Sequence, residues 1–460
     1  STIKKDKTTK LITFSSMLLA QTEDSQFNIG LQAESSTGKS YIPLEMISYF
    51  PEEEAMVIAG ASPTAFFHDK GYYDEENRRY LVDLEGKILI FLDQPHFFLL
   101  ERLRPLLSHD KKELEYKITD KNKGGSLRTK TVIIRGFPCV IFCTVKLDPD
   151  EQEKTRLFLL SPETDEGKLR ETIQLLAQKH GNINVYRQNI DQNCKRKLLQ
   201  ERIVKIRAKK IKNIIVQDVE KLVQRFYENN RKLKPRDQRD FPRIISLIKS
   251  HALLNCFTRE AVGQFDIMAN EVDVEAGFVL YADISTANEL GLPPYVYEVF
   301  NKVFIPLFES GISVSRQEIE KKYFEVYFKP LNYTWFNKFL EPSLMSAGLV
   351  LKEPDPVDKR KVLYYPNEIY MLKHWGYTKK EESGEKTTRS PIQLHISLNM
   401  ALLIFKRISD NSLDKVVPHT MWKEELLKTG ATPEQSEDVI ATLNKGCKVI
   451  EVRSGHYKLA

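Results

Sequence analysis

The sequence lacks the cysteine pattern of a disulfide-bonded or zinc-binding protein. Its five cysteines are scattered along the chain and form no Cys-x-x-Cys pair. Cys139 and Cys143 lie four residues apart in a β-rich run, but no histidine follows them at metal-ligand spacing. We therefore expect these two side chains to lie on one face of a buried strand, in a protein from a reducing compartment.

The sequence also lacks long apolar runs and a strong net charge. No stretch approaches the roughly 18 apolar residues that span a bilayer, and the N-terminal STIKKDKTTK has no signal-peptide core. We expect a soluble, cytoplasmic protein that makes no membrane contact. The 69 basic side chains face 63 acidic ones, and a net charge of +6 identifies no partner by itself.

At 460 residues the chain is longer than one hydrophobic core usually supports, so several domains are expected. Short β-rich runs, FNIGLQA, AMVIAG, KILIFLD, PCVIFCT and RLFLLSP, alternate with helical patterns in the first third, which predicts an α/β core with a parallel sheet. The expected divisions are the core at 1–165, a helical region at 166–310, a winged helix at 311–376, a linker at 377–392 and a smaller winged-helix-like domain at 393–460.

A glycine-containing segment, Ala33-Glu-Ser-Ser-Thr-Gly38-Lys39-Ser40, follows the first strand with the spacing of a P-loop. Such a loop turns backbone N–H groups toward phosphate oxygens, its lysine reaches the β and γ phosphates, and its serine binds magnesium. ATP and Mg²⁺ are therefore the expected cofactors, and the alternative is a chance Gly-Lys-Ser in a turn. The residues expected to contact the nucleotide are Ala33, Glu34, Ser35, Ser36, Thr37, Gly38, Lys39, Ser40 and Tyr41.

A second carboxylate for the magnesium ion is expected at Asp93, where the apolar strand KILIFLD ends. The next position usually carries a glutamate that activates water, but this chain has Gln94, whose amide cannot accept a proton. Two explanations stay open. A glutamate-to-glutamine exchange is a common engineered change for trapping bound nucleotide, and a natural site of low turnover is the other.

Two further polar residues have positions suited to the same reaction. Thr144 ends the strand PCVIFCT, where it is expected to orient water or the γ-phosphate beside Asp93, unless it is an ordinary strand terminus. Arg156 directly precedes the strand LFLLSP, at the subunit edge in ring ATPases, where an arginine reaches a neighbour's γ-phosphate. Taken alone, it would be read as a surface arginine.

With these elements in this order, the chain resembles the AAA+ ATPases, and most closely the minichromosome-maintenance-type (MCM-like) helicases. The resemblance covers roughly residues 20–260 and rests on YLVDLEGKILIFLDQ, on a hairpin before the Thr144 strand, and on the arginine before LFLLSP. The segment RDFPRIISLIKSHALLN is similar to that family's helical lid, which usually carries an arginine acting across the subunit interface. The resemblance suggests Arg243 for this role, with Arg239 as the second choice.

The resemblance implies a homo-hexamer and is compatible with replication partners such as a primase. The chain departs from the family in having no N-terminal oligonucleotide-binding domain and no zinc-binding cysteine cluster. It is therefore either a compact relative, for example from a mobile element, or a piece of a longer chain.

Single-stranded and forked DNA is the expected partner because of a basic hairpin. Two β-like arms surround Asp-Lys-Asn-Lys-Gly-Gly in ELEYKITDKNKGGSLRTKTVII, a strong hairpin signal. In a ring its tip would point into the pore and contact phosphates, although a charged tip also prevents edge pairing. The residues expected to bind DNA here are Lys121, Lys123, Arg128 and Lys130.

The first winged helix has a predicted recognition helix in TWFNKFLEPSLMSAG and a basic wing with Lys359, Arg360 and Lys361. Trp335, Phe336 and Phe339 recur at helical spacing and are expected to be core residues. The basic stretch Lys195–Lys212 is either a phosphate-binding face or a solvated helix face.

Two functions remain in competition, a hexameric ATP-driven DNA helicase or translocase and an ATP-gated DNA-binding switch with little turnover.

Overall fold

The computed structural model describes most of the chain. The described residues are 1–34, 36–62, 66, 72–93, 95–121, 127–144, 156–229, 233, 236–310, 313–355, 361–367, 401, 404–405, 408–409, 415–428, 433–445 and 449–459. They form two compact units, Ser1–Asn301 and Lys302–Ala460.

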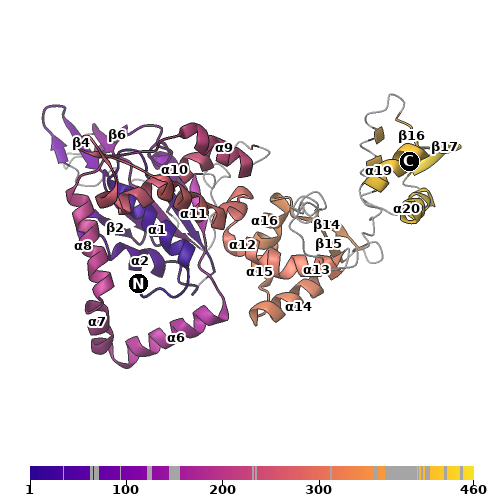
Figure 1. Cartoon of the computed structure of the whole chain (residues 1–460), viewed down its shortest axis with the longest axis horizontal. Helices are drawn as coiled ribbons and strands as arrows, with labels where there is room; N and C mark the ends of the chain where they lie inside the picture. Colours follow the sequence, from indigo (N-terminus) through magenta and orange to yellow (C-terminus); the bar gives the residue numbers. More distant parts are fainter. Residues whose placement is uncertain are drawn as a thin grey trace. The chain divides into compact units, whose positions relative to one another are not determined.

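The first unit is built on a five-stranded parallel sheet (Figure 1). Its strands, in the spatial order β2-β5-β8-β1-β9, are β1 (Asn28–Gln32), β2 (Ala55–Ile58), β5 (Ile88–Phe91), β8 (Cys139–Thr144) and β9 (Leu157–Leu160). All five predicted strands are confirmed. Every residue of β1, β5, β8 and β9 is buried, because both faces of the sheet are covered, and such strands read as continuous apolar runs.

Successive side chains along each strand enter two different cores. On β5, Ile88 and Ile90 pack on one face, whereas Leu89 and Phe91 pack on the other. The first face is covered by the helices α1 (Lys7–Leu18), α2 (Tyr41–Ile47), α8 (Cys194–Ala208), α10 (Asp237–Leu254) and α11 (Glu271–Glu289). The second face is covered by α4 (Phe97–Leu107) and a four-stranded sheet.

The four-stranded sheet contains the predicted hairpin. Its strands, in the order β3-β4-β7-β6, are β3 (Tyr72–Asp74), β4 (Arg79–Asp83), β6 (Glu113–Lys121) and β7 (Leu127–Arg135). The arms β6 and β7 pair antiparallel from Glu113 opposite Arg135 to Lys121 opposite Leu127, which confirms the hairpin. Leu114 and Ile134 face the second core, so the base of the hairpin is anchored by apolar packing.

Residues after β9 are mainly helical, as the sequence predicts. Besides α8, α10 and α11, the helices are α6 (Glu166–Gly181), α7 (Ile183–Asp191), α9 (Val219–Asn229) and α12 (Pro294–Val299). Elsewhere the first unit has short 3₁₀ turns at Leu19–Gln21, Glu52–Glu54 and Cys256–Thr258. The predicted boundary at residue 165 falls inside the first unit, just before α6. Between α10 and α11 the backbones approach so closely that a Cβ on Gly277 would lie 2.9 Å from the backbone nitrogen of Ile248.

A small three-stranded sheet in this helical region is absent from the sequence-based prediction. It joins β10 (Asn213–Ile215), β12 (Asp266–Met268) and β11 (Ala261–Val262) in that order. Strands of two or three residues are too short to leave a periodic pattern in the sequence, and this is why the prediction of a wholly helical segment was incomplete.

The basic stretch Lys195–Lys212 forms α8 and the residues after it, and two of its cations are used inside the protein. Arg196 Nη1 lies 2.7 Å from Glu45 Oε1, and Arg207 Nη2 lies 3.0 Å from Glu54 Oε2. Arg207 also donates hydrogen bonds to two carbonyl oxygens of α1. These contacts attach α8 to the helical layer, so part of the basic stretch has a structural role.

The second unit repeats one arrangement twice. The first copy contains β13 (Val314–Ser315), α14 (Arg316–Tyr327), α15 (Tyr333–Trp335), α16 (Glu341–Ser346), β14 (Val350–Pro354) and β15 (Val362–Pro366), after α13 (Ile305–Ser310). The second copy contains β16 (Val417–Pro418), α19 (His419–Lys428), α20 (Pro433–Lys445), β17 (Val449–Arg453) and β18 (His456–Leu459). The strand orders β13-β15-β14 and β16-β18-β17 correspond, and both predicted hairpins are present.

A π-helical stretch, Phe336–Leu340, joins α15 to α16, and a second one covers Phe300–Phe304. Each is followed by a proline, Pro342 or Pro306, whose missing N–H removes a regular helical hydrogen bond. Phe336 and Phe339 are buried, at 0% and 8% exposure, which confirms that they are core residues. Trp335, predicted to be a third core residue, is only half-buried.

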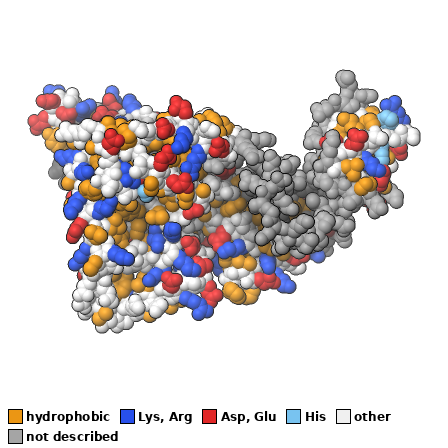
Figure 2. Space-filling view, in the orientation of Figure 1, with side chains coloured by type: hydrophobic (Ala, Val, Ile, Leu, Met, Phe, Trp, Pro, Cys, Tyr) orange, Lys and Arg blue, Asp and Glu red, His pale blue; other side chains and the backbone are white. Residues whose placement is uncertain are grey.

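The surface drawn in Figure 2 has Lys and Arg side chains interspersed with Asp and Glu, in keeping with the small net charge. In the part of the chain that the structure describes, no helix is both long and apolar enough to cross a membrane.

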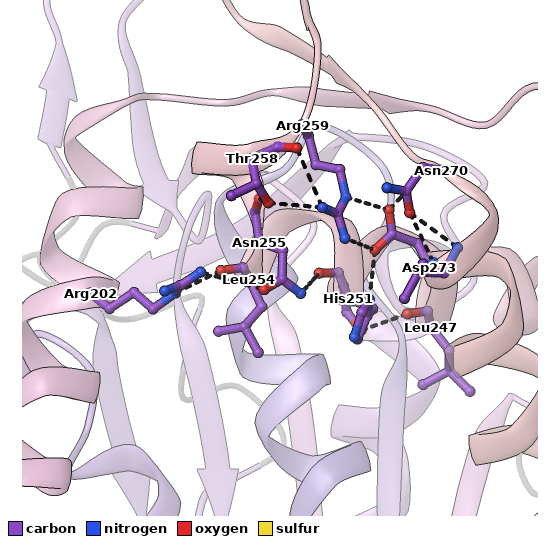
Figure 3. Close-up of polar contacts among 11 residues, drawn as sticks. Arg202, Leu247, His251, Leu254, Asn255, Thr258, Arg259, Asn270 and Asp273 are labelled. Carbon is purple, nitrogen blue, oxygen red and sulfur yellow. Dashed lines mark hydrogen bonds and ion pairs between the residues drawn. The ribbon is translucent and has the colours of Figure 1, made fainter.

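A buried carboxylate, Asp273, connects α11 to the end of α10 (Figure 3). Arg259 donates to it from Nε and Nη2, each at 2.7 Å, and His251 Nδ1 lies 2.6 Å away. Asn270 and Asp273 form a capping box at the start of α11. Burial by itself would raise the pKa of Asp273, but hydrogen bonds from His251, Arg259 and Asn270 outweigh it and lower the pKa to about 2.

We predict that Asp273→Asn lowers the free energy of unfolding by about 3 kcal/mol at neutral pH, because Arg259 loses its buried partner. The pKa of Asp273 in the folded protein lies below its ordinary value of 3.8, so the ionised carboxylate stabilises the fold at pH values above 3.8. As the pH falls from 3.8 toward 2, the free energy of unfolding of the wild type should decrease by about 2 kcal/mol. Denaturant unfolding at several pH values measures both effects. Glu271→Gln, in the same helical turn but exposed, is the matched control and should change stability by less than about 0.5 kcal/mol.

Candidate functional site

Three neighbouring strands bring the predicted nucleotide-binding residues to one edge of the parallel sheet. Gln32, the last residue of β1, is paired with Thr144, the last residue of β8. On the other side of β8, Phe91, the last residue of β5, is paired with Phe142, and Asp93 follows β5 by two residues at the same edge of the sheet. In open α/β sheets, the carboxyl ends of the strands form the edge where ligands bind.

The loop after β1 contains two residues in the left-handed backbone region. Ser36 and Gly38 adopt positive φ angles of 65° and 90°, and left-handed residues in such turns let successive N–H groups converge on an anion. A Cβ on Gly38 would have no atom within 4 Å, so glycine is used here for its backbone conformation and not for close packing. The loop leads directly into α2, which starts at Tyr41.

Lys39 and Ser40 occupy the end of this loop and are partly buried. Lys39 Nζ donates to the carbonyl of Glu34 at 3.4 Å, so the side chain folds back along its own loop. At the start of the loop, the N–H of Ala33 donates to the carbonyl of Thr144 at 3.4 Å. Thr144 is buried at 3% exposure, whereas Asp93 is exposed.

The oxygen ligands available at this edge fit magnesium. Ser40 supplies a hydroxyl and Asp93 a carboxylate, and Mg²⁺ is usually held by one or two such ligands together with substrate phosphates and water. Among the described residues, no group of three or more His, Cys, Asp or Glu is arranged to hold a metal ion.

Cys143 lies next to the loop, a contact that the sequence analysis did not predict. The analysis assigned Cys139 and Cys143 to the core, and both are confirmed as fully buried, at 0% exposure. Burial raises the pKa of each thiol to about 12. Cys143 Sγ donates to the carbonyl of Lys39 at 3.7 Å. The available signal was its place directly before Thr144, the residue predicted to end that strand at the nucleotide site.

Arg156 lies at the opposite edge of the sheet from the loop. It directly precedes β9, and its Nε donates to Ser108 Oγ at 2.5 Å. It lines a cavity of about 320 Å³ together with Arg239, Arg243 and Asn28, the first residue of β1. The five residues of β1 separate the two edges by roughly 16 Å. Arg156 therefore lies far from the loop of its own chain.

Arg243 is buried, at 7% exposure, and already has internal partners. Its Nη1 donates to Asp240 Oδ1 at 2.7 Å, and its guanidinium lies 5.0 Å from the ring centre of Phe158. Burial lowers the pKa of Arg243 to about 10. Arg239, the second choice in the sequence analysis, is exposed in the same cavity.

The predicted DNA-binding residues are only partly covered by the described structure. Lys130, on β7, places its Nζ 3.7 Å from the ring centre of Tyr80, so its cation packs on the four-stranded sheet. Lys361 is exposed, and its carbonyl accepts a hydrogen bond from the backbone N–H of Asp355 at 3.0 Å.

Several predicted site residues, or their side chains, lie outside the described structure. They are Ser35, Gln94, Lys121, Lys123, Arg128, Lys359 and Arg360, together with the linker 377–392.

A cavity of about 430 Å³ lies among α9, α11 and the small sheet, away from the loop. Its three cations each have a carboxylate partner: Lys221 lies 2.6 Å from Glu271, Arg225 lies 2.8 Å from Glu275 and Arg259 lies 2.7 Å from Asp273.

Comparison with other proteins gives no independent assignment of the site: no protein-family model matches the chain, and no curated protein is significantly similar to it. The geometry of the two sheet edges therefore carries the functional argument.

We predict that Arg243→Ala lowers the free energy of unfolding by about 3 kcal/mol, since it removes one cation from the fully buried Asp240. Arg239 lies one turn earlier on α10 and is exposed, so Arg239→Ala should lower the free energy of unfolding by less than about 0.5 kcal/mol. Thermal or denaturant unfolding of both variants measures the difference. Equal stabilities for both variants would contradict a structural role for the Arg243–Asp240 pair.

Proposed function

We propose that this chain is an ATP-hydrolysing motor of the AAA+, MCM-like class that moves on single-stranded DNA and separates duplex DNA. The observation that carries the proposal is the glycine-containing loop at the carboxyl end of β1, beside Asp93 and Thr144. A five-stranded parallel sheet flanked by helices is compatible with a P-loop-like core.

In this proposal, loop amides and Lys39 would bind the phosphates of ATP, and Ser40 and Asp93 would hold Mg²⁺, which would supply positive charge beside the phosphate oxygens. Thr144 orients the attacking water. Gln94 follows Asp93 in the sequence and cannot accept a proton from that water. Slow turnover is therefore expected from the unaltered chain.

The remote position of Arg156 supports an oligomer. An arginine some 16 Å from its own loop cannot stabilise a phosphate there, whereas in a closed ring each subunit presents this edge to its neighbour. Arg239 is exposed in the same cavity, which supports an interface role for it, whereas Arg243 is buried and paired with Asp240. We propose a homo-hexamer in which Arg156 acts on the neighbour's nucleotide.

DNA contact is proposed for the β6–β7 hairpin and the second unit. The first arm, β6, ends at Lys121, and Lys123 follows it in the sequence. The repeated strand and helix order of the second unit is compatible with two winged-helix domains, the first with Lys359, Arg360 and Lys361 in its wing. Gln94 supports the alternative function, an ATP-gated DNA-binding switch.

Steady-state ATP hydrolysis, measured with and without single-stranded DNA, tests this function. We expect Gln94→Glu to raise DNA-stimulated turnover by at least about tenfold, because it restores a proton acceptor, and Lys39→Ala in that background to abolish it. If ATP tightens DNA binding but Gln94→Glu shows no turnover, the motor is wrong and the switch replaces it.

A mixing experiment tests the position of Arg156. In the Gln94→Glu background, Arg156→Ala and Lys39→Ala should each be inactive alone. Mixed in equal amounts, they should recover turnover at about a quarter of the interfaces, those that combine an intact loop with an intact arginine from the neighbour. Absence of recovery, with mixed oligomers verified by mass, would contradict action between subunits.

A further inference from the structure

Two phenylalanine rings are exposed at the C-terminal end of α14, which Figure 1 labels in the second unit. Phe324 is 54% exposed, and Phe328, the residue directly after the helix, is 78% exposed. The N–H of Phe328 donates to the carbonyl of Phe324 at 2.9 Å, so the two residues lie one helical turn apart. The core side of α14 is formed by other residues, Ile319 and Tyr323, at 0% and 3% exposure. The two exposed rings are therefore not part of the core.

The backbone of Phe328 is strained. It adopts the left-handed conformation, with φ 53° and ψ 27°, which is unusual for a bulky side chain. A residue that follows a helix in this conformation is most often glycine. The chain thus keeps a large aromatic ring at an exposed position where the backbone favours glycine, and strain of this kind is concentrated at functional sites.

The second copy of the same arrangement shows that the fold does not need these rings. Its helix α19 follows a short first strand as α14 does, but the four residues between α19 and α20 are Thr-Gly-Ala-Thr. Trp422, the only Phe, Tyr or Trp of α19, is fully buried, and the exposed apolar side chains there include Met421, at 51%. The exposed rings at the end of α14 therefore call for an explanation other than folding.

The charges around the rings favour an anionic partner. All three carboxylates of α14 already have partners at or within the helix. They are Glu320, paired with Arg316 at 2.8 Å, Glu325, paired with Lys322 at 3.2 Å, and Glu318, in the capping box at the start of the helix. Two further lysines, Lys321 and Lys329, are exposed, one three residues before Phe324 and the other directly after Phe328. The surface around the rings therefore carries an excess of positive charge.

We propose that Phe324 and Phe328 form a stacking surface for the bases of single-stranded DNA, with Lys321 and Lys329 beside its phosphates. The inference rests on the DNA contact proposed above for the second unit and adds the chemistry of that contact. Proteins that bind single strands with little sequence preference combine aromatic rings, on which bases stack, with nearby cations. The bases of a duplex are stacked on one another, so this surface distinguishes a single strand from a duplex.

The test measures the affinity of the full chain for a labelled single strand of mixed sequence and for its duplex, by fluorescence anisotropy. For Phe324→Ala and for Phe328→Gly, we expect the dissociation constant of the single strand to rise about tenfold and that of the duplex to stay unchanged. Phe328→Tyr, which keeps a ring, should bind as the wild type does. Phe328→Gly should unfold at the same or a higher denaturant concentration than the wild type, because glycine relieves the left-handed strain.

The salt dependence of binding separates stacking from charge. Both Phe324→Ala and Phe328→Gly should leave the slope of log affinity against log salt concentration unchanged, whereas Lys321→Gln should reduce its magnitude by about 0.7, as expected for one phosphate contact with a single strand. Met421→Ala removes a side chain of similar exposure from α19. It is the matched control and should change neither affinity.

Unchanged single-strand affinity in both Phe324→Ala and Phe328→Gly would overturn the inference, and so would an equal loss of duplex affinity or an equal loss in Met421→Ala. Each of these results would leave the DNA contact of the proposed function intact. Failure of the wild type to bind single-stranded DNA at all would instead overturn the proposed function, and the inference with it.

Discussion

The pairing of β8 with β1 on one side and β5 on the other is the constraint on which the candidate site depends. All six residues of β8 are buried, and its side chains alternate between two separate cores. A shift of one residue would exchange the faces, moving Cys143 out of one core and Phe142 out of the other, so the register is strongly fixed. That register sets Thr144 beside Gln32 and brings the end of β5, which Asp93 follows, to the same edge of the sheet.

The parallel direction of the strands separates the polar residues into two groups. Residues that follow a strand, such as Lys39, Asp93 and Thr144, lie at the carboxyl edge, whereas Arg156 precedes β9 and lies at the amino edge. Because α10 passes this amino edge, Arg239 and Arg243 line the same cavity as Arg156. Under the proposed function, a complete site therefore combines the carboxyl edge of one chain with the amino edge of another.

Several arginine side chains of the first unit form internal ion pairs. Arg207 and Arg243 are buried beside Glu54 and Asp240, where an ion pair has a small net effect on stability but removal of one partner is costly. Arg196 likewise attaches α8 to α2 through Glu45. A count of basic residues along Lys195–Lys212 therefore overstates the positive charge available for binding, because sequence does not reveal which cations have internal partners.

The sequence by itself determined the five buried strands, the β6–β7 hairpin and the spacing of Gly38, Lys39 and Ser40, because these follow from local apolar periodicity and turn chemistry. It did not reveal the β10-β12-β11 sheet, whose strands are too short to show a period. Only the tertiary structure decided that Cys143 contacts the loop and that Arg156, Arg239 and Arg243 share a cavity. Those contacts join residues far apart in the chain, and they depend on strand order, register and helix packing, which local sequence does not specify.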